Sequence, residues 1–340
     1  MKTGIAICFL FLSVHLFAQD GIEDLLASGV DDAQRFSQDY FSPGTDAVIY
    51  GMSSGWFNSA KSKKFLRFEI SAIGNLSFTD SDNQSFTLNE SDYTNLTFQS
   101  GPSSQNVATA LGENNPDINM IVNVIEPNSN LSEQIPLTLP QGLASEGIDF
   151  VPTGFIQASI GLIKGFEVKA RFLPEINTED IDSKFYGFGL QNELTELIPF
   201  DKILPIRIAV MAGYSKYEGK FRFNDNSSII SGVNRRIESE AESWLFAGIV
   251  STKLPVINFY GSLGYVTGDA TTSLLGQYNL NTGLSGVDSQ PLIDPFSVSS
   301  DVSDFKATLG FKLSLAFFRI HADYSFQEYN TASVGISIGI

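Results

Sequence analysis

Residues 305–317 read FKATLGFKLSLAF, and this stretch decides the fold. Every odd position carries an apolar side chain, while Lys306, Thr308, Lys312 and Ser314 occupy even positions. A period of two residues is typical of a β-strand whose two faces meet different surroundings. One face of this strand is suited to an apolar medium and the other to water.

The same alternation recurs along most of the chain. Residues 66–72 read LRFEISA and residues 166–172 read FEVKARF, each with apolar side chains on one face and charges on the other. Little helical pattern separates the strands, and no run reaches the roughly 20 apolar residues of a transmembrane helix. The pattern predicts an all-β fold: a transmembrane antiparallel β-barrel of the outer-membrane type, with lipid outside and water inside.

Ten strands are identified in this way, near residues 66, 156, 166, 185, 206, 238, 257, 305, 320 and 332. Their long connections fall at one end and their short turns at the other, as in outer-membrane barrels. The long outer connections at 79–147 and 268–303 are each expected to hide a further hairpin, because structureless loops of that length are uncommon. Tyr93–Phe98 with Ile118–Ile125, and Thr271–Leu280, are the candidate segments. We therefore expect 12 to 14 strands in a barrel formed by residues 63–340.

The first 62 residues differ from the rest. Residues 1–18 resemble a signal peptide, with Lys2 before a short apolar run and Ala18 as the cleavage position. Residues 19–62 form a helical N-terminal segment, with a helix expected over 19–40 and ended by residues 42–44 (SPG). Two interpretations of residues 51–60 remain open, a plug in the lumen or a periplasmic lead-in. The plug candidates are Gly51, Ser53, Gly55, Trp56, Phe57 and Asn58.

Composition limits the function. The chain has 21 Lys and Arg against 38 Asp and Glu, a net charge of −17, which argues against nucleic acid as a partner. The one cysteine, Cys8, lies in the predicted signal peptide, so no thiolate metal site is expected. His321 and Asp323 share an inward face, but no motif supplies a nucleophile. We predict no enzyme activity, no metal and no cofactor.

The inward faces of the strands carry charges of both signs. They either satisfy one another as salt bridges in a wet interior, or line the lumen and hold a plug or a solute. Lys169, Arg171 and Arg207 lie on neighbouring strands and are the best candidates for holding an anionic group. The lumen-lining candidates are Arg67, Glu69, Glu167, Lys169, Arg171, Arg207, Lys306, Lys312, Arg319, His321 and Asp323.

Several segments together resemble a known group of proteins. They are the helical lead, the small-residue stretch at 51–60, the first strand KFLRFEI (64–70) and the strand YGFGLQNEL (186–194). They resemble uncharacterised Bacteroidetes outer-membrane β-barrel proteins, which are similar to the FadL-type long-chain fatty-acid transporters. The resemblance implies a 14-stranded barrel with an N-terminal hatch that passes small hydrophobic ligands such as fatty acids.

Two functions follow as hypotheses. The first is a FadL-like channel or transporter for small hydrophobic solutes. The alternative is a structural or surface-binding barrel with a closed lumen, which acts through its acidic outer loops. Either protein would be exported to the Gram-negative outer membrane, where its partners are the barrel-assembly machinery and the membrane lipids.

Overall fold

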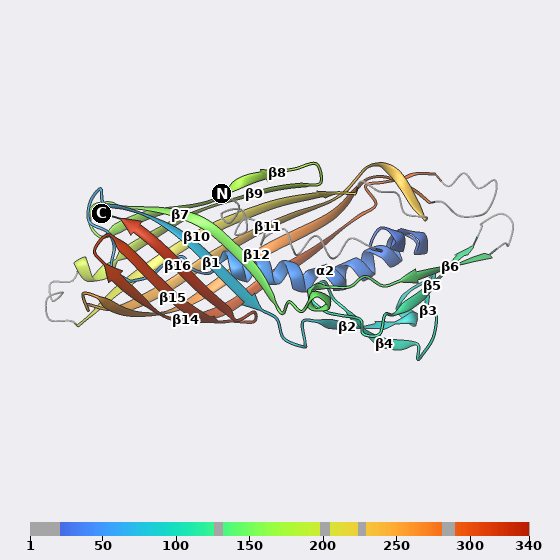
Figure 1. The fold of residues 1–340 in the computed structure, drawn as a ribbon, viewed down its shortest axis with the longest axis horizontal. Helices are drawn as coiled ribbons and strands as arrows, with labels where there is room; N and C mark the ends of the chain where they lie inside the picture. The colour runs from blue at the N-terminus through green and yellow to red at the C-terminus, as the bar shows by residue number, and fades with distance from the viewer. Residues whose placement is uncertain (1–20, 126–131, 198–204, 224–228, 281–289, 340) are drawn as a thin grey trace.

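A computed structural model describes residues 21–125, 132–197, 205–223, 229–280 and 290–339. Ten antiparallel strands close into a barrel in the order β11-β10-β9-β8-β7-β1-β16-β15-β14-β12, with β12 paired back to β11 (Figure 1). The predicted barrel is therefore confirmed. The strands are β1 (Phe68–Phe78), β7 (Phe150–Gly161), β8 (Phe166–Asn177), β9 (Ile181–Glu193), β10 (Ile206–Arg222), β11 (Ile230–Thr252), β12 (Ile257–Leu280), β14 (Phe296–Leu315), β15 (Phe318–Phe326) and β16 (Thr331–Gly339).

Alternation along the strands separates an apolar exterior from a polar interior. On β14, Phe305 is 78% exposed and Leu309 is 64% exposed, whereas Lys306 and Thr308 between them are each 3% exposed. Exposed apolar side chains also cover the outer faces of β1 and β16. Such a surface would be unfavourable in water and is suited to lipid. None of the helices in the described ranges is both long and apolar enough to cross a bilayer.

The expected count of 12 to 14 strands is wrong, because neither long connection adds strands to the barrel. Residues 268–280 continue β12, which is 24 residues long, well beyond the 9–11 residues that span a bilayer. Two small sheets form from the other connection, and Leu96 pairs with Val122 as expected but outside the barrel. The small sheets contain β2 (Ser85–Asn89) with β4 (Ser104–Ala108), and β3 (Leu96–Phe98), β5 (Asn119–Ile125) and β6 (Ser132–Thr138), while β13 (Leu292–Ile293) pairs with the extension of β12.

The two ends of the barrel differ. Short turns join β7 to β8, β11 to β12 and β14 to β15 at one end, where β16 also finishes. At the turn after β7, Lys164 and Gly165 both have positive φ, as a tight two-residue hairpin requires. The extended strands and small sheets lie at the opposite end (Figure 1). By the layout of outer-membrane barrels, we name the short-turn end the inner, periplasmic end and the other the outer end.

One long helix runs inside the barrel. It is α2 (Val30–Met52), preceded by the short η2 (Asp24–Ser28), and it contacts strands around the barrel, namely β1, β7, β11, β12 and β14. Its N-terminal half lies at the outer end and its C-terminus points toward the inner end (Figure 1). The predicted helix end at residues 42–44 is wrong, because Pro43 lies inside the helix. Tertiary packing, such as that of Gly44 against Ala110 and Leu111 of the long outer connection, outweighs the local helix-breaking residues.

The outer end has an apolar core of its own. Leu25 and Phe36 of the N-terminal helices are fully buried there with Met120 of the small sheets and Tyr278 of the β12 extension. The small sheets therefore anchor the start of α2 over the barrel. The remaining helices in the described residues are η3 (Glu90–Asp92), η4 (Leu143–Glu146) and η5 (Leu194–Leu197). The predicted signal peptide lies outside the described residues.

Candidate functional site

Residues 21–64, which we call the plug, start in the core of the outer end and continue down into the lumen of the barrel. Below α2, residues 53–64 continue as irregular backbone, which we call the lower plug. All six plug candidates lie in or next to this segment. Gly51 accepts a hydrogen bond on its carbonyl from Asn75 at 3.0 Å, and Gly55 adopts a φ of +68° with Ile73 of the wall facing it. Phe57 packs edge-on against Tyr260. These residues therefore lie against the inner face of the wall.

Trp56 is the largest buried side chain of the lower plug, with 1% exposure. Its indole lies over Gly189 of β9 and Gly213 of β10, which are direct cross-strand partners. A Cβ atom at either glycine would approach the indole to 2.8 Å. The guanidinium of Arg171 lies over the ring at 3.6 Å. The wall thus provides a flat seat for Trp56 that only glycine allows.

Basic side chains of the wall hold the plug by its backbone and its small polar side chains. Lys169 donates to the carbonyl of Trp56 at 3.0 Å, and Arg171 donates to the carbonyl of Met52 at 3.1 Å. The two residues therefore contact the plug, whereas Arg207 lies at the basic cavity of the inner end and pairs with Glu193. Two residues of β14 add three further contacts. Lys306 donates to the Ser54 hydroxyl at 2.6 Å and the Ser53 hydroxyl at 3.2 Å, and Lys312 donates to the Asn58 amide oxygen at 3.1 Å.

Carboxylates of the wall pair with cations near the inner end. Lys63 of the plug contacts Glu167 at 2.9 Å and Glu69 at 3.2 Å. Burial opposes the charge on Lys63, but the two carboxylates raise its pKa overall. Arg319 also pairs with Glu69, at 2.9 Å, and Arg207 pairs with Glu193. Some inward charges therefore pair with each other as salt bridges, and others contact the plug.

His321 and Asp323 are both buried between the wall and the plug. Asp323 accepts a hydrogen bond from the Tyr260 hydroxyl at 2.8 Å. The His321 ring lies against Gly335, and neither ring nitrogen has a hydrogen-bond partner among the described residues. No serine with an oxyanion donor accompanies the pair in these contacts. Across the residues that the structure describes, no group of three or more His, Cys, Asp or Glu side chains is arranged to hold a metal ion.

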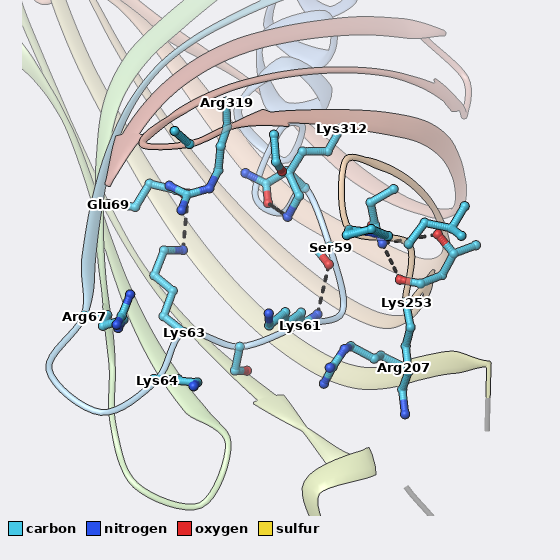
Figure 2. A pocket seen from close by; sticks show the side chains of 18 of the residues that line it. Ser59, Lys61, Lys63, Lys64, Arg67, Glu69, Arg207, Lys253, Lys312 and Arg319 are labelled. Atoms are coloured by element: carbon cyan, nitrogen blue, oxygen red, sulfur yellow. Dashed lines mark hydrogen bonds and ion pairs between the residues drawn. The ribbon is translucent and has the colours of Figure 1, made fainter. Parts of the chain in front are cut away.

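A basic cavity of ≈ 530 Å³ opens at the inner end, where the lower plug meets the wall. Arg67, which precedes β1, is exposed there instead of lining the barrel wall. Sequence reasoning missed Lys61, Lys63, Lys64 and Lys253, which line the same cavity. The run KSKK at 61–64 was a usable signal, because it is a dense basic run in an acidic chain. Figure 2 shows these side chains around the cavity, which is lined by Asn58, Ser59, Lys61, Ser62, Lys63, Lys64, Arg67, Phe68, Glu69, Arg207, Thr252, Lys253, Leu254, Pro255, Asn258, Lys312, Ser314, Ala316 and Arg319.

A second, mostly apolar crevice lies between α2 and the wall in the outer half. Phe41 and Val48 line it from the helix, and Pro152, Tyr217 and Ala241 line it from the wall. It holds ≈ 40 Å³, room for no more than a few water-sized groups. The lumen therefore contains an apolar layer toward the outer end and a polar layer toward the inner end.

A closed antiparallel barrel with a lipid-suited exterior and an internal plug defines an outer-membrane β-barrel protein. The chain belongs to a family of unknown function, DUF6588, whose model matches residues 1–340. No curated protein matches the sequence.

Solved outer-membrane barrels are similar at a low level. Ail, the attachment invasion locus protein of Yersinia pestis, is 8% identical with a TM-score of 0.26, over 81% of this chain and 97% of that chain. The translocator domain of autotransporter NalP from Neisseria meningitidis is 9% identical with a TM-score of 0.25, over 92% and 98%. OpdQ of Pseudomonas aeruginosa is 8% identical with a TM-score of 0.14, over 81% and 97%. We draw no functional argument from these scores.

Proposed function

We propose that the protein is a plugged transport barrel that admits small hydrophobic solutes when its plug shifts, as the resemblance to FadL-type transporters implies. The observation that carries this proposal is the apolar crevice between α2 and the wall. Its ≈ 40 Å³ is too small for such a solute, so passage requires movement of the helix.

Two features favour a plug that moves. Pro43 lies within α2 beside the crevice-lining Phe41 and Gly44, and proline removes a backbone hydrogen bond and weakens the helix at that point. Below the crevice, polar contacts hold the plug, and the buried Arg171 Nη2 and Gln191 Oε1 atoms have no hydrogen-bond partner among the described residues. Water can replace such contacts at lower cost than it can enter a sealed apolar interface.

A reversible lock tests the proposal. A Cβ at Gly51 of the plug would lie 2.6 Å from Cγ2 of Thr153 on β7, so Gly51→Cys with Thr153→Cys places two thiols in bonding range. In reconstituted vesicles, we expect the oxidised pair to stop entry of a hydrophobic fluorescent solute and a reductant to restore it. Ser71→Cys with Ser337→Cys is the matched control, because it joins two neighbouring wall strands without touching the plug.

The closed-lumen alternative predicts a different result. The small sheets and extended strands at the outer end form a folded surface on which a partner could bind. Under that function, wild type and the locked variant admit the solute equally poorly, and removal of the outer sheets abolishes partner capture. Equal entry into vesicles with the locked and unlocked plug would contradict the transport proposal.

A further inference from the structure

The basic cavity at the inner end is lined by many more cationic side chains than carboxylates. Its lining contains eight basic side chains and one carboxylate, Glu69. Glu167 and Glu193 pair with two of these cations from just outside the lining. The eight are Lys61, Lys63, Lys64, Arg67, Arg207, Lys253, Lys312 and Arg319.

Three of these cations have no ion-pair partner among the described residues: Lys61, Lys64 and Arg67. Lys312 donates to a neutral amide, so it too lacks a carboxylate of its own. Desolvation at the cavity, followed by the neighbouring charge of Arg207, lowers the pKa of Lys61. Such crowding of like charges is unfavourable in an otherwise acidic chain unless an anion offsets it.

The cavity is built from two parts of the chain that face each other. The lower plug supplies Lys61, Lys63 and Lys64 on one side, and the wall and its turns supply Lys253, Lys312 and Arg319 on the other (Figure 2). Ser62 also lines it, is 3% exposed, and its hydroxyl has no hydrogen-bond partner among the described residues. A buried donor among convergent cations is a feature of a binding site and not of a solvated surface.

We propose that this cavity binds a small phosphate-bearing polyanion between the plug and the wall. Its ≈ 530 Å³ lies within the range of small-molecule sites and exceeds the needs of a simple inorganic ion. Arginine presents a planar fork to phosphate and lysine a mobile point charge, and both surround the cavity. The proposal does not depend on transport, because the site is complete with the plug in place.

Inorganic pyrophosphate is the probe, and calorimetric titration of the full-length protein in neutral detergent at low salt is the measurement. We expect saturable binding of one pyrophosphate per barrel. Lys64→Gln with Arg67→Gln, both exposed at the mouth, should weaken it at least about tenfold, because each change removes a charge-assisted hydrogen bond to the anion. Lys164→Gln is the matched control, because Lys164 is exposed at the same end and does not line the cavity.

A second arm distinguishes the two sources of phosphate. The titration is repeated in nanodiscs of zwitterionic lipid and of phosphatidylglycerol. Weaker pyrophosphate binding in the anionic discs, absent in the Lys64/Arg67 variant, would identify lipid headgroups as the occupant, whereas equal binding in both would identify a soluble anion. Absence of saturable binding in detergent, or an equal loss in the Lys164→Gln control, would overturn the proposal.

Discussion

The guanidinium of Arg171 lies between two aromatic rings, 3.6 Å from the centre of the Trp56 ring and 4.0 Å from that of Phe155. Arg171 belongs to the wall and Trp56 to the plug, so this stack is a direct link between the two. The same guanidinium group also bonds the carbonyl of Met52. One wall residue therefore holds the plug through both its charge and its flat face.

Replacing Trp56 with alanine should release the lower plug. The change leaves a cavity over the glycine seat and removes a ring from Arg171, and large-to-small changes of this kind cost about 3–5 kcal/mol. We expect faster protease cleavage within residues 53–64 while the barrel keeps its resistance to unfolding in detergent. Phe57→Leu, a smaller change in the same segment, should accelerate cleavage less. Unchanged cleavage of the Trp56→Ala plug would contradict this role.

A side chain added to the wall at the glycine seat should also displace Trp56, because it would occupy the space of the indole. Gly189→Val places branched carbons where a Cβ alone would already approach the indole to 2.8 Å. We expect increased ion conductance in planar bilayers, because the lower plug can no longer pack on the wall. Gly248→Val is the control, since Gly248 faces outward on β11 and a Cβ there meets nothing closer than 3.9 Å. Equal conductance of the two variants would argue against the seat.

Attachment of α2 should weaken as the pH rises through about 6. Burial, with the nearby carboxylates of Glu328 and Asp301, raises the pKa of Asp46 from 3.8 to about 6. The Asp46 carboxyl therefore binds its proton more tightly when α2 is packed in the barrel than when the plug is released. The resulting stabilisation of the packed helix is complete below about pH 4 and is lost above about pH 6. Hydrogen exchange of α2 amides, corrected for intrinsic rates, should show less protection at pH 8 than at pH 5.

Asp46→Asn should remove most of that pH dependence, because the amide does not ionise. Asp31→Asn provides the comparison, since Asp31 is an exposed carboxylate in the first turn of the same helix. If protection of α2 changes with pH to the same extent in wild type and in Asp46→Asn, the assignment to Asp46 is wrong.

A charge on the outer face of β14 should prevent membrane insertion. Leu309 is 64% exposed in the middle of the apolar band, and an arginine at such a position costs about 2–4 kcal/mol in a barrel. Folding of Leu309→Arg into lipid vesicles, followed by denaturant titration, should show this loss. Val233→Arg is the control, because Val233 is 60% exposed on the part of β11 beyond the band. Equal losses of stability in the two variants would contradict the assignment of the membrane to the apolar band around Leu309.

Alternation in the sequence predicted the wall well, because lipid and lumen impose opposite demands on successive residues. The ten strands identified near 66 to 332 are the ten of the barrel. The extra strands were wrongly expected, since periodicity cannot tell a wall strand from the small sheet of Leu96–Phe98 and Asn119–Ile125 or from an extension of β12. Pro43 misled the helix prediction because the stabilising contacts of α2 come from residues distant in sequence.

The site was predicted less completely. Inward residues such as Lys169 and Lys306 follow from strand parity, but their partners on the plug do not. The basic cavity depends on Lys61 and Lys64, which follow no period, and on how the plug sits against the turns of the wall. Those relations arise only when the barrel closes, so no local pattern contains them.

The direction of α2 has a consequence for the path of the chain. The described chain starts at the outer end, runs down the lumen to the inner end and only then enters β1 (Figure 1). The plug and β1 therefore run through the barrel in opposite directions, and the ten strands enclose a helix that comes before all of them in the sequence.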